Sequence, residues 1–351
     1  MDRMINPLPV LSLMPQARTI IRDCLKLKPG EQLAILWDET VSPELVQAAR
    51  IAAQELGAYS SLVVYEPLTY RPIEEFCHFA GRSLKEQIPV PPMLLGCMQA
   101  ADASLLFMSD MEMTLSPSFQ EVLGNRKRIL VIPYLDSATA RRILFNRAEQ
   151  VNSLCREVQY YGEMLERGKV AKLCSAEGSE LTIKLGQWQA RCGTGVPGPG
   201  EIQILPGGQV TRIPNDDSME GTLVVDRTIA ARYYKELHES IRLHIKKGQV
   251  IAVEGGTEAK ILREFLDDQA DPRAFHVTEL GIGLNPLCRL GRLAALGEDT
   301  HARGTVSLAL GCDTHLGGGT PGPFHVDMTM RFPSLSIDGR DIIQDGRLVQ
   351  A

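Results

Sequence analysis

Apolar residues in the first half of the chain follow two patterns, helical spacing and short continuous runs. Between residues 14 and 27, Ala17, Ile20 and Cys24 recur at the spacing of one helix face. By this reasoning helices are expected over 14–27, 42–56 and 116–123, and strands over 33–37, 61–65, 103–108 and 128–135. Strands that alternate with helices are typical of a parallel sheet covered on both faces, so a doubly wound α/β domain is predicted.

The pattern changes after a long helical segment expected over 138–167. Glycine and proline then become frequent, and short alternating strands replace the strand–helix rhythm. Strands are expected over 181–185, 210–213, 221–226, 241–245, 250–254, 334–337 and 340–343, with one helix over 258–266. We therefore place a domain boundary near Gly168, with a Rossmann-like α/β domain over 1–168 and a strand-rich α+β domain over 169–351.

Composition and charge exclude several classes of protein. The 351 residues carry 37 basic and 43 acidic side chains, a formal charge of -6, and no long basic run, so nucleic acid is not an expected partner. The early strands are followed by neither a Gly-x-Gly-x-x-Gly turn nor a Gly-Lys-Ser/Thr phosphate loop, so no nucleotide is assigned. The cysteines lack the spacing of zinc or redox motifs, and the N-terminal residues resemble neither a signal peptide nor a membrane anchor. A cytoplasmic protein without a membrane partner is expected.

The segment 324–330 carries the most informative pattern, because apolar and polar residues alternate along it. As a strand it turns His325, Asp327 and Thr329 toward one face, while the apolar residues between them enter a core. An imidazole and a carboxylate on one face form half of a metal site. The glycine-rich approach at 317–323 leaves room beside this strand for a ligand. The alternative is a solvated sheet face without chemistry.

Three further side chains in the second half are candidates for the same site. Glu279 is favoured over His276 as a ligand, because a strand places residues three apart on opposite faces. His315 lies in the loop before the strand 324–330 and could reach the site as ligand, acid or base, or remain a solvated loop residue. A serine hydrolase is disfavoured, because the sequence has no Gly-x-Ser-x-Gly elbow.

Several short motifs, most of them in the second half, occur together. They are Pro214-Asn215-Asp216-Asp217-Ser218, Glu220-Gly221-Thr222, Glu254-Gly255-Gly256, Glu279-Leu280-Gly281-Ile282-Gly283, Gly304-Thr305-Val306, His325-Val326-Asp327 and Ile337-Asp338-Gly339. This set resembles the M29 aminopeptidase (aminopeptidase T-like) family and its relative, the 2,5-dihydroxypyridine 5,6-dioxygenase family. The resemblance spans most of the chain, and it implies a metalloenzyme with a small-molecule substrate that forms a homo-oligomer.

The aminopeptidases of this family hold two metal ions, and the resemblance implies that three of their ligands correspond to Glu279, His325 and Asp327. The residues that stand at the other three ligand places are Gln209, Ser307, and either Thr314 or His315. The resemblance therefore implies a site for one ion rather than two.

The dioxygenase holds a single ferrous ion with two histidines and one carboxylate. Its His-x-Asp strand is similar to His325-Val326-Asp327, whereas its other iron-binding histidine falls at Glu279. Its substrate-site histidine precedes a Ser-Pro pair, where this chain has Leu115-Ser116-Pro117. The expected site thus has one imidazole and two carboxylates, a donor set that suits Fe2+, Mn2+ or Zn2+.

The leading hypothesis is a metal-dependent hydrolase that cleaves a C–N bond in a small amino-acid-derived or cyclic amide substrate. In it, Glu279, His325 and Asp327 hold the ion, and His315 is the catalytic base that helps to deprotonate bound water. The secondary candidates for the site are His276, Thr329, Gln209 and Ser307.

Two other functions compete with the hydrolase. The first is a non-haem Fe(II) ring-opening dioxygenase acting on a hydroxylated N-heterocycle, with His315 or His276 supplying a second imidazole. The second is a metal-free binding protein on the same fold, which the substitutions at Gln209, Ser307 and Leu115 would allow. Oxygen uptake and metal content separate the three.

Overall fold

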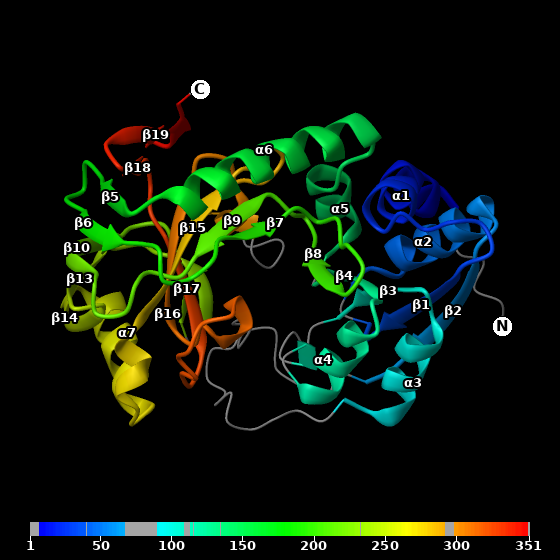
Figure 1. The fold of residues 1–351 in the computed structure, drawn as a ribbon, viewed down its shortest axis with the longest axis horizontal. Helices are drawn as coiled ribbons and strands as arrows, with labels where there is room; N and C mark the ends of the chain where they lie inside the picture. Colours follow the sequence, from blue (N-terminus) through cyan, green and yellow to red (C-terminus); the bar gives the residue numbers. More distant parts are fainter. Residues whose placement is uncertain are drawn as a thin grey trace.

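The described residues form three β-sheets with helices packed around them (Figure 1). The computed structural model describes residues 7–39, 41–66, 90–108, 113–114, 116–133, 135–231, 233–291 and 298–349. In Figure 1 the parallel sheet and its helices lie on the right, and the two strand-rich sheets lie on the left. The expected mixed α/β fold class, with a parallel sheet and a strand-rich part, is confirmed.

A parallel sheet with the strand order β2-β1-β3-β4-β8 organises the first half. Its strands are β1 (Gln32–Trp37), β2 (Tyr59–Val64), β3 (Ala103–Phe107), β4 (Arg128–Ile132) and β8 (Glu201–Ile204). The first four match the expected apolar runs. All five residues of β3 are buried, as expected for a strand covered by helices on both faces.

Helices cover this sheet, and their ends follow the capping signals of the sequence. They are α1 (Pro7–Thr19), α2 (Pro43–Leu56), α3 (Pro92–Ala100), α4 (Pro117–Gly124) and α5 (Ser137–Ile143). Ser42 caps α2 by accepting a hydrogen bond from the Leu45 amide, and Gly57 ends the helix with a φ of 81°. The helix expected over 14–27 instead begins at Pro7, and it continues past Thr19 as a π-helical turn over Ile20–Cys24.

The segment expected as one helix over 138–167 is two helices, so that expectation was wrong. The break lies between α5 and α6 (Ala148–Arg167). Beyond α6 the chain also returns to the first sheet, because β8 pairs in parallel with β4. The division of the chain at Gly168 remains a prediction. Strand β8 lies after this boundary in the sequence but pairs with β4, which lies before it.

The remaining strands form two antiparallel sheets, with orders β14-β13-β10-β6-β5-β18-β19-β20 and β12-β11-β17-β16-β15-β9-β7. The first contains β5 (Val170–Cys174), β6 (Glu180–Lys184), β10 (Glu220–Val225), β13 (Ile241–Lys246), β14 (Gln249–Gly255), β18 (Ser334–Ile337), β19 (Arg340–Gln344) and β20 (Arg347–Leu348). The second contains β7 (Arg191–Gly193), β9 (Gln209–Arg212), β11 (Thr228–Ala231), β12 (Tyr233–Glu236), β15 (Val277–Gly283), β16 (Val306–Gly311) and β17 (His325–Thr329). The short elements between them are α7 (Thr257–Asp268), α8 (Glu298–His301) and the 3₁₀ turns Pro272–Phe275 and Thr314–Leu316.

The hairpin between β18 and β19 turns at Asp338-Gly339, a dipeptide typical of type I′ turns. Asp338 and Gly339 both have positive φ, 49° and 83°, as a type I′ turn requires. The Asp338 carboxylate also accepts hydrogen bonds from the amides of Lys169 and Val170, which joins the hairpin to the start of β5.

Helix α6 lies against the strand β9 of the sheet that carries the candidate ligands (Figure 1). Gly162 lets α6 approach β7 closely, because a Cβ atom at this position would lie 2.3 Å from the Cys192 Sγ on β7. From β9, the Arg212 guanidinium donates hydrogen bonds to the carbonyls of Glu166 and Gly168 at the helix end.

Within the described residues, neither α6 nor any other helix is both long and apolar enough to cross a membrane.

Candidate metal centre

The three predicted ligands lie on one face of the sheet formed by β15, β16 and β17. The strand register aligns Glu279 with Ala309, and Ala309 with Asp327, so the two acids flank a small residue. Their side chains converge on His325, whose Nε2 atom lies 3.6 Å from Glu279 Oε2 and 3.4 Å from Asp327 Oδ1. The alternation along β17 explains this placement, because Val326 and the other intervening apolar side chains are buried.

The orientation of His325 is set by a main-chain oxygen. Its Nδ1 atom lies 2.8 Å from the carbonyl oxygen of Cys312. A carbonyl can only accept, so Nδ1 carries a proton and Nε2 is the nitrogen that faces the two carboxylates. The imidazole is 4% exposed, which holds it in this orientation. A neutral histidine with a free Nε2 lone pair is the form that binds a metal ion.

Glu279 is held by a neutral hydrogen-bond donor. Gln209 Nε2 lies 3.3 Å from Glu279 Oε1 and 3.4 Å from Ser307 Oγ. The side chains meet over Gly281, where a Cβ atom would lie 2.2 Å from Ser307 Oγ and 3.0 Å from Glu279 Oε1. Gln209 therefore supports Glu279 through a hydrogen bond and is itself held by Ser307, and Glu279 Oε2 faces His325.

His315 reaches the same place from a different element. It lies in the 3₁₀ turn Thr314–Leu316, and its ring stands edge-on to His325 with centroids 4.4 Å apart. Among the described residues, donor atoms of Glu279, His315 and His325 all lie within 4.8 Å of one another. His315 is thus the histidine that the structure brings to the predicted ligands.

The other two secondary candidates face different partners. His276 Nδ1 lies 3.3 Å from the hydroxyl oxygen of Thr320, and His276 is not a member of the group formed by Glu279, His315 and His325 within the described residues. The Thr329 hydroxyl accepts a hydrogen bond from the Thr228 amide and belongs to a buried network that includes Asp299. Leu115, which the resemblance aligns with a substrate-site histidine, lies outside the described residues.

Burial and like charge shift the protonation of this cluster. Burial, together with the negative charge of Asp327, raises the pKa of Glu279 to about 8. For His325, burial favours the neutral form, but the charges of Asp327 and Glu279 outweigh it and raise the pKa to about 9. Glu279 and His325 therefore hold protons at neutral pH in the metal-free protein, and a divalent cation would replace those protons. The donor set therefore fits a metal ion.

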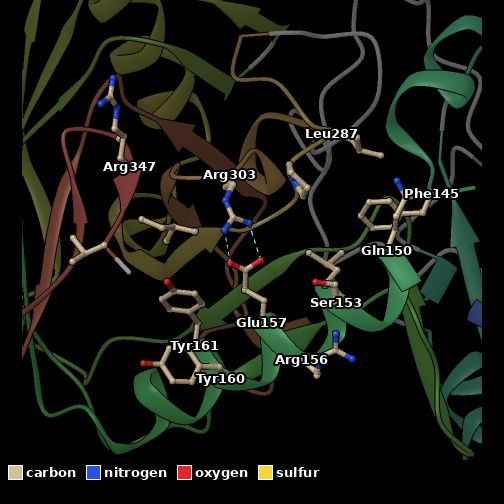
Figure 2. Close-up of a pocket in the computed structure, with 15 residues that line it drawn as sticks. Phe145, Gln150, Ser153, Arg156, Glu157, Tyr160, Tyr161, Leu287, Arg303 and Arg347 are labelled. Carbon is tan, nitrogen blue, oxygen red and sulfur yellow. Dashed lines mark hydrogen bonds and ion pairs between the residues drawn. The ribbon is translucent and has the colours of Figure 1, made fainter. Parts of the chain in front are cut away.

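A cavity of about 940 Å³ lies apart from this cluster, between α6 and the segment that contains β20 (Figure 2). At its centre in Figure 2, Arg303 and Glu157 form a bidentate ion pair with N–O distances of 2.6 and 2.7 Å. The lining residues include Tyr160 and Tyr161 but none of Glu279, His315, His325 and Asp327. The predicted metal site is therefore separate from this cavity.

Comparison with known proteins places the chain in a family. A family model described as 2,5-dihydroxypyridine 5,6-dioxygenase matches residues 13–350. The chain belongs to the 2,5-dihydroxypyridine 5,6-dioxygenase family. A curated member, the 2,5-dihydroxypyridine 5,6-dioxygenase of Pseudomonas putida KT2440, is 27% identical over 331 residues, which is 91% of each chain.

Two solved structures share the fold. The 2,5-dihydroxypyridine dioxygenase of Pseudomonas putida KT2440 matches with a TM-score of 0.80 at 24% identity, over 97% of this chain and 98% of that one. AmpT from Thermus thermophilus matches with a TM-score of 0.66 at 18% identity, over 97% and 99%. The suspected superfamily, which links aminopeptidase T to the dioxygenase, is confirmed.

Family membership corrects the leading hypothesis from the sequence. A hydrolase was favoured over a dioxygenase because Glu279 matches a peptidase carboxylate, but the matching family and the curated relative are dioxygenases. The preference for a hydrolase was therefore wrong. The error came from one ligand type: a carboxylate at 279 does not distinguish the two chemistries, because both use carboxylates as ligands.

Proposed function

We propose that this protein is a non-haem Fe(II) dioxygenase that opens the ring of a small hydroxylated N-heterocycle. Its family and its curated relative carry the name of such an enzyme, and the relative aligns over 91% of its own length. The observation that carries the proposal is the convergence of Glu279, His315 and His325, whose donor atoms lie within 4.8 Å of one another.

The ion in this proposal is held by Glu279, His315 and His325, with Asp327 as a fourth donor. Two imidazoles and a carboxylate are the donor set of many non-haem Fe(II) oxygenases. His315 supplies the second imidazole from the turn Thr314–Leu316, and Glu279 supplies the carboxylate. The donor set is therefore complete. Bound Fe(II) would supply the redox chemistry that joins O₂ to the substrate ring.

The surrounding residues prepare these donors. The Cys312 carbonyl keeps the proton of His325 on Nδ1, and Gln209 keeps Glu279 Oε2 directed at His325. Burial of Glu279 and His325 excludes water from this side of the site. Asp327 is half-buried, so the open side of the cluster lies next to it.

An oxygen-uptake assay tests the proposal. Protein loaded with Fe(II) under nitrogen is mixed with 2,5-dihydroxypyridine and related hydroxylated pyridines, with and without O₂. We expect substrate loss with matching oxygen consumption in air and no reaction under nitrogen. His325→Ala should abolish the reaction, whereas Glu157→Gln, which changes an acid in the separate cavity, should retain it.

Two results would overturn this function. Turnover under nitrogen would exclude oxygen as a reactant. Protein purified without chelator that carries no stoichiometric metal would point instead to a binding protein on the same fold. The homo-oligomer that the family resemblance implies remains a prediction, and sedimentation of the purified protein measures it.

A further inference from the structure

We propose that Arg191 is a positioning residue of the metal centre, which anchors the main chain of His315 so that the imidazole of His315 stands beside His325. The proposal rests on the proposed function in one respect, that His315 is a donor to the metal ion. It adds a residue that contacts no donor side chain directly and acts through the loop that carries one.

Arg191 comes from the edge of the sheet that carries the ligands. It lies on β7, where it pairs with Thr211 of β9, and Thr211 pairs with Gly281 of β15. Residues aligned across neighbouring strands share a face, so Arg191 projects from the face that bears Glu279. From there its Nη1 atom donates a hydrogen bond to the carbonyl oxygen of His315, 2.7 Å away.

Short-range hydrogen bonds also organise the loop around His315. The amides of Leu316 and Gly318 donate to the Asp313 carbonyl, and the Thr320 amide donates to the Asp313 carboxylate. At the start of the loop, the Cys312 carbonyl holds His325. The bond from Arg191 ties the middle of this loop to a strand 124 residues earlier in the sequence. Both imidazoles are therefore placed through main-chain oxygens of one loop.

Arg191 also acts on the site through its charge. Its positive charge acts on Glu279 and opposes the rise in the pKa of that carboxyl group. Loss of the guanidinium would release His315, and it would also remove a positive charge that acts on Glu279. A double-mutant cycle separates the two routes, because only the first disappears when His315 is already absent.

The experiment titrates Co²⁺ into metal-free protein and follows the visible absorption of the bound ion. Four proteins are compared: wild type, Arg191→Met, His315→Ala and the double variant. We expect Arg191→Met to weaken Co²⁺ binding about ten-fold in the wild-type background, the scale seen for groups that orient ligands, and to have no further effect when His315 is absent. Arg191→Lys keeps one donor and the charge, and should recover part of the loss.

A matched control is Arg303→Met, which removes another arginine that donates to a main-chain carbonyl, that of Leu284. It should leave Co²⁺ affinity unchanged. The proposal is overturned if Arg191→Met weakens Co²⁺ binding equally with and without His315, which would assign its effect to Glu279. It is also overturned if the variant raises KM for the substrate and leaves Co²⁺ binding intact, which would make Arg191 a substrate-binding residue.

Hydrogen–deuterium exchange of metal-free protein gives a readout that does not depend on the metal. Arg191→Met should speed exchange in the peptide that contains 313–320, and unchanged exchange there would contradict the proposal. If wild-type protein binds no Co²⁺, the proposed function fails, while the exchange measurement still decides whether Arg191 holds the loop.

Discussion

The imidazole of His325 donates its Nδ1 proton to the carbonyl oxygen of Cys312, across 2.8 Å. This one bond decides which nitrogen faces Glu279 and Asp327, because the acceptor is a main-chain oxygen that cannot donate. The Cys312 side chain takes no part in it. The carbonyl of Cys312 therefore has a role in the site that its thiol does not share. Replacing the side chain of Cys312 tests this difference.

Replacement of His325 and replacement of Cys312 should have opposite outcomes for metal binding. His325→Ala removes a donor and should abolish stoichiometric metal binding. Cys312→Ala keeps the carbonyl and should retain metal binding, with a loss of about 1 kcal/mol in the free energy of unfolding from the small space left behind. Metal content by elemental analysis and thermal unfolding measure both effects. Loss of metal from Cys312→Ala would show that the thiol itself takes part.

Gly281 should be intolerant of a side chain. The Cβ atom of Gly281→Ala would lie 2.2 Å from Ser307 Oγ, so Ser307 and Gln209 must move and Glu279 loses its support. We expect metal affinity to fall by at least about ten-fold. Gly96→Ala is the matched control, because no atom lies within 4 Å of its added Cβ in helix α3. It should keep full affinity and gain about 0.5–1 kcal/mol of stability. Equal affinity in the two variants would contradict this account of Gly281.

The predictable part of this site is the part that follows from strand alternation. His325 and Asp327 share a face because they are two residues apart, and Glu279 joins them through the register of neighbouring strands. The alternating pattern is visible in the sequence, whereas the register is not. The same holds for the fold, where short apolar runs in the sequence predicted β1 to β4.

The parts that could not be predicted depend on long-range contacts or on the main chain. A carbonyl such as that of Cys312 has no sequence signature, because every residue carries one. Arg191 lies 124 residues before His315, and no spacing rule links them. The pairing of β8 with β4 in the first sheet also depends on long-range contacts. A four-residue strand is too short to show a clear hydrophobic period in the sequence.

The stability of the metal-free protein should fall as pH rises toward 9. Glu279 has a pKa of about 8 in the folded protein against an ordinary 4.5, and His325 about 9 against 6.5. Both folded values are higher, so the folded state binds protons that the unfolded chain releases, and stability declines as pH rises through this range. Thermal unfolding of chelator-treated protein between about pH 6 and 9 measures the decline.

Metal loading provides the control for this pH dependence. Bound metal requires the deprotonated carboxylate and neutral imidazole, so its binding releases protons and strengthens as pH rises. The loaded protein should therefore lose less stability than the metal-free protein over the same range. A metal-free protein whose unfolding temperature rises between these pH values would show that the cluster does not retain protons in the folded state.

The contact between α6 and β7 should be sensitive to a single methyl group. Gly162→Ala would place a Cβ atom 2.3 Å from Cys192 Sγ, and the helix and strand must separate to admit it. We expect a loss of about 1–3 kcal/mol in the free energy of unfolding, the usual cost of overpacking. Removing the thiol at the same time, in the double variant Gly162→Ala/Cys192→Ala, should recover most of that loss because the sulfur is the atom that clashes. Urea unfolding of the two single variants and the double variant measures the coupling. Additive losses would show that the helix and strand are kept together by other contacts, such as the bonds from Arg212 to the end of α6.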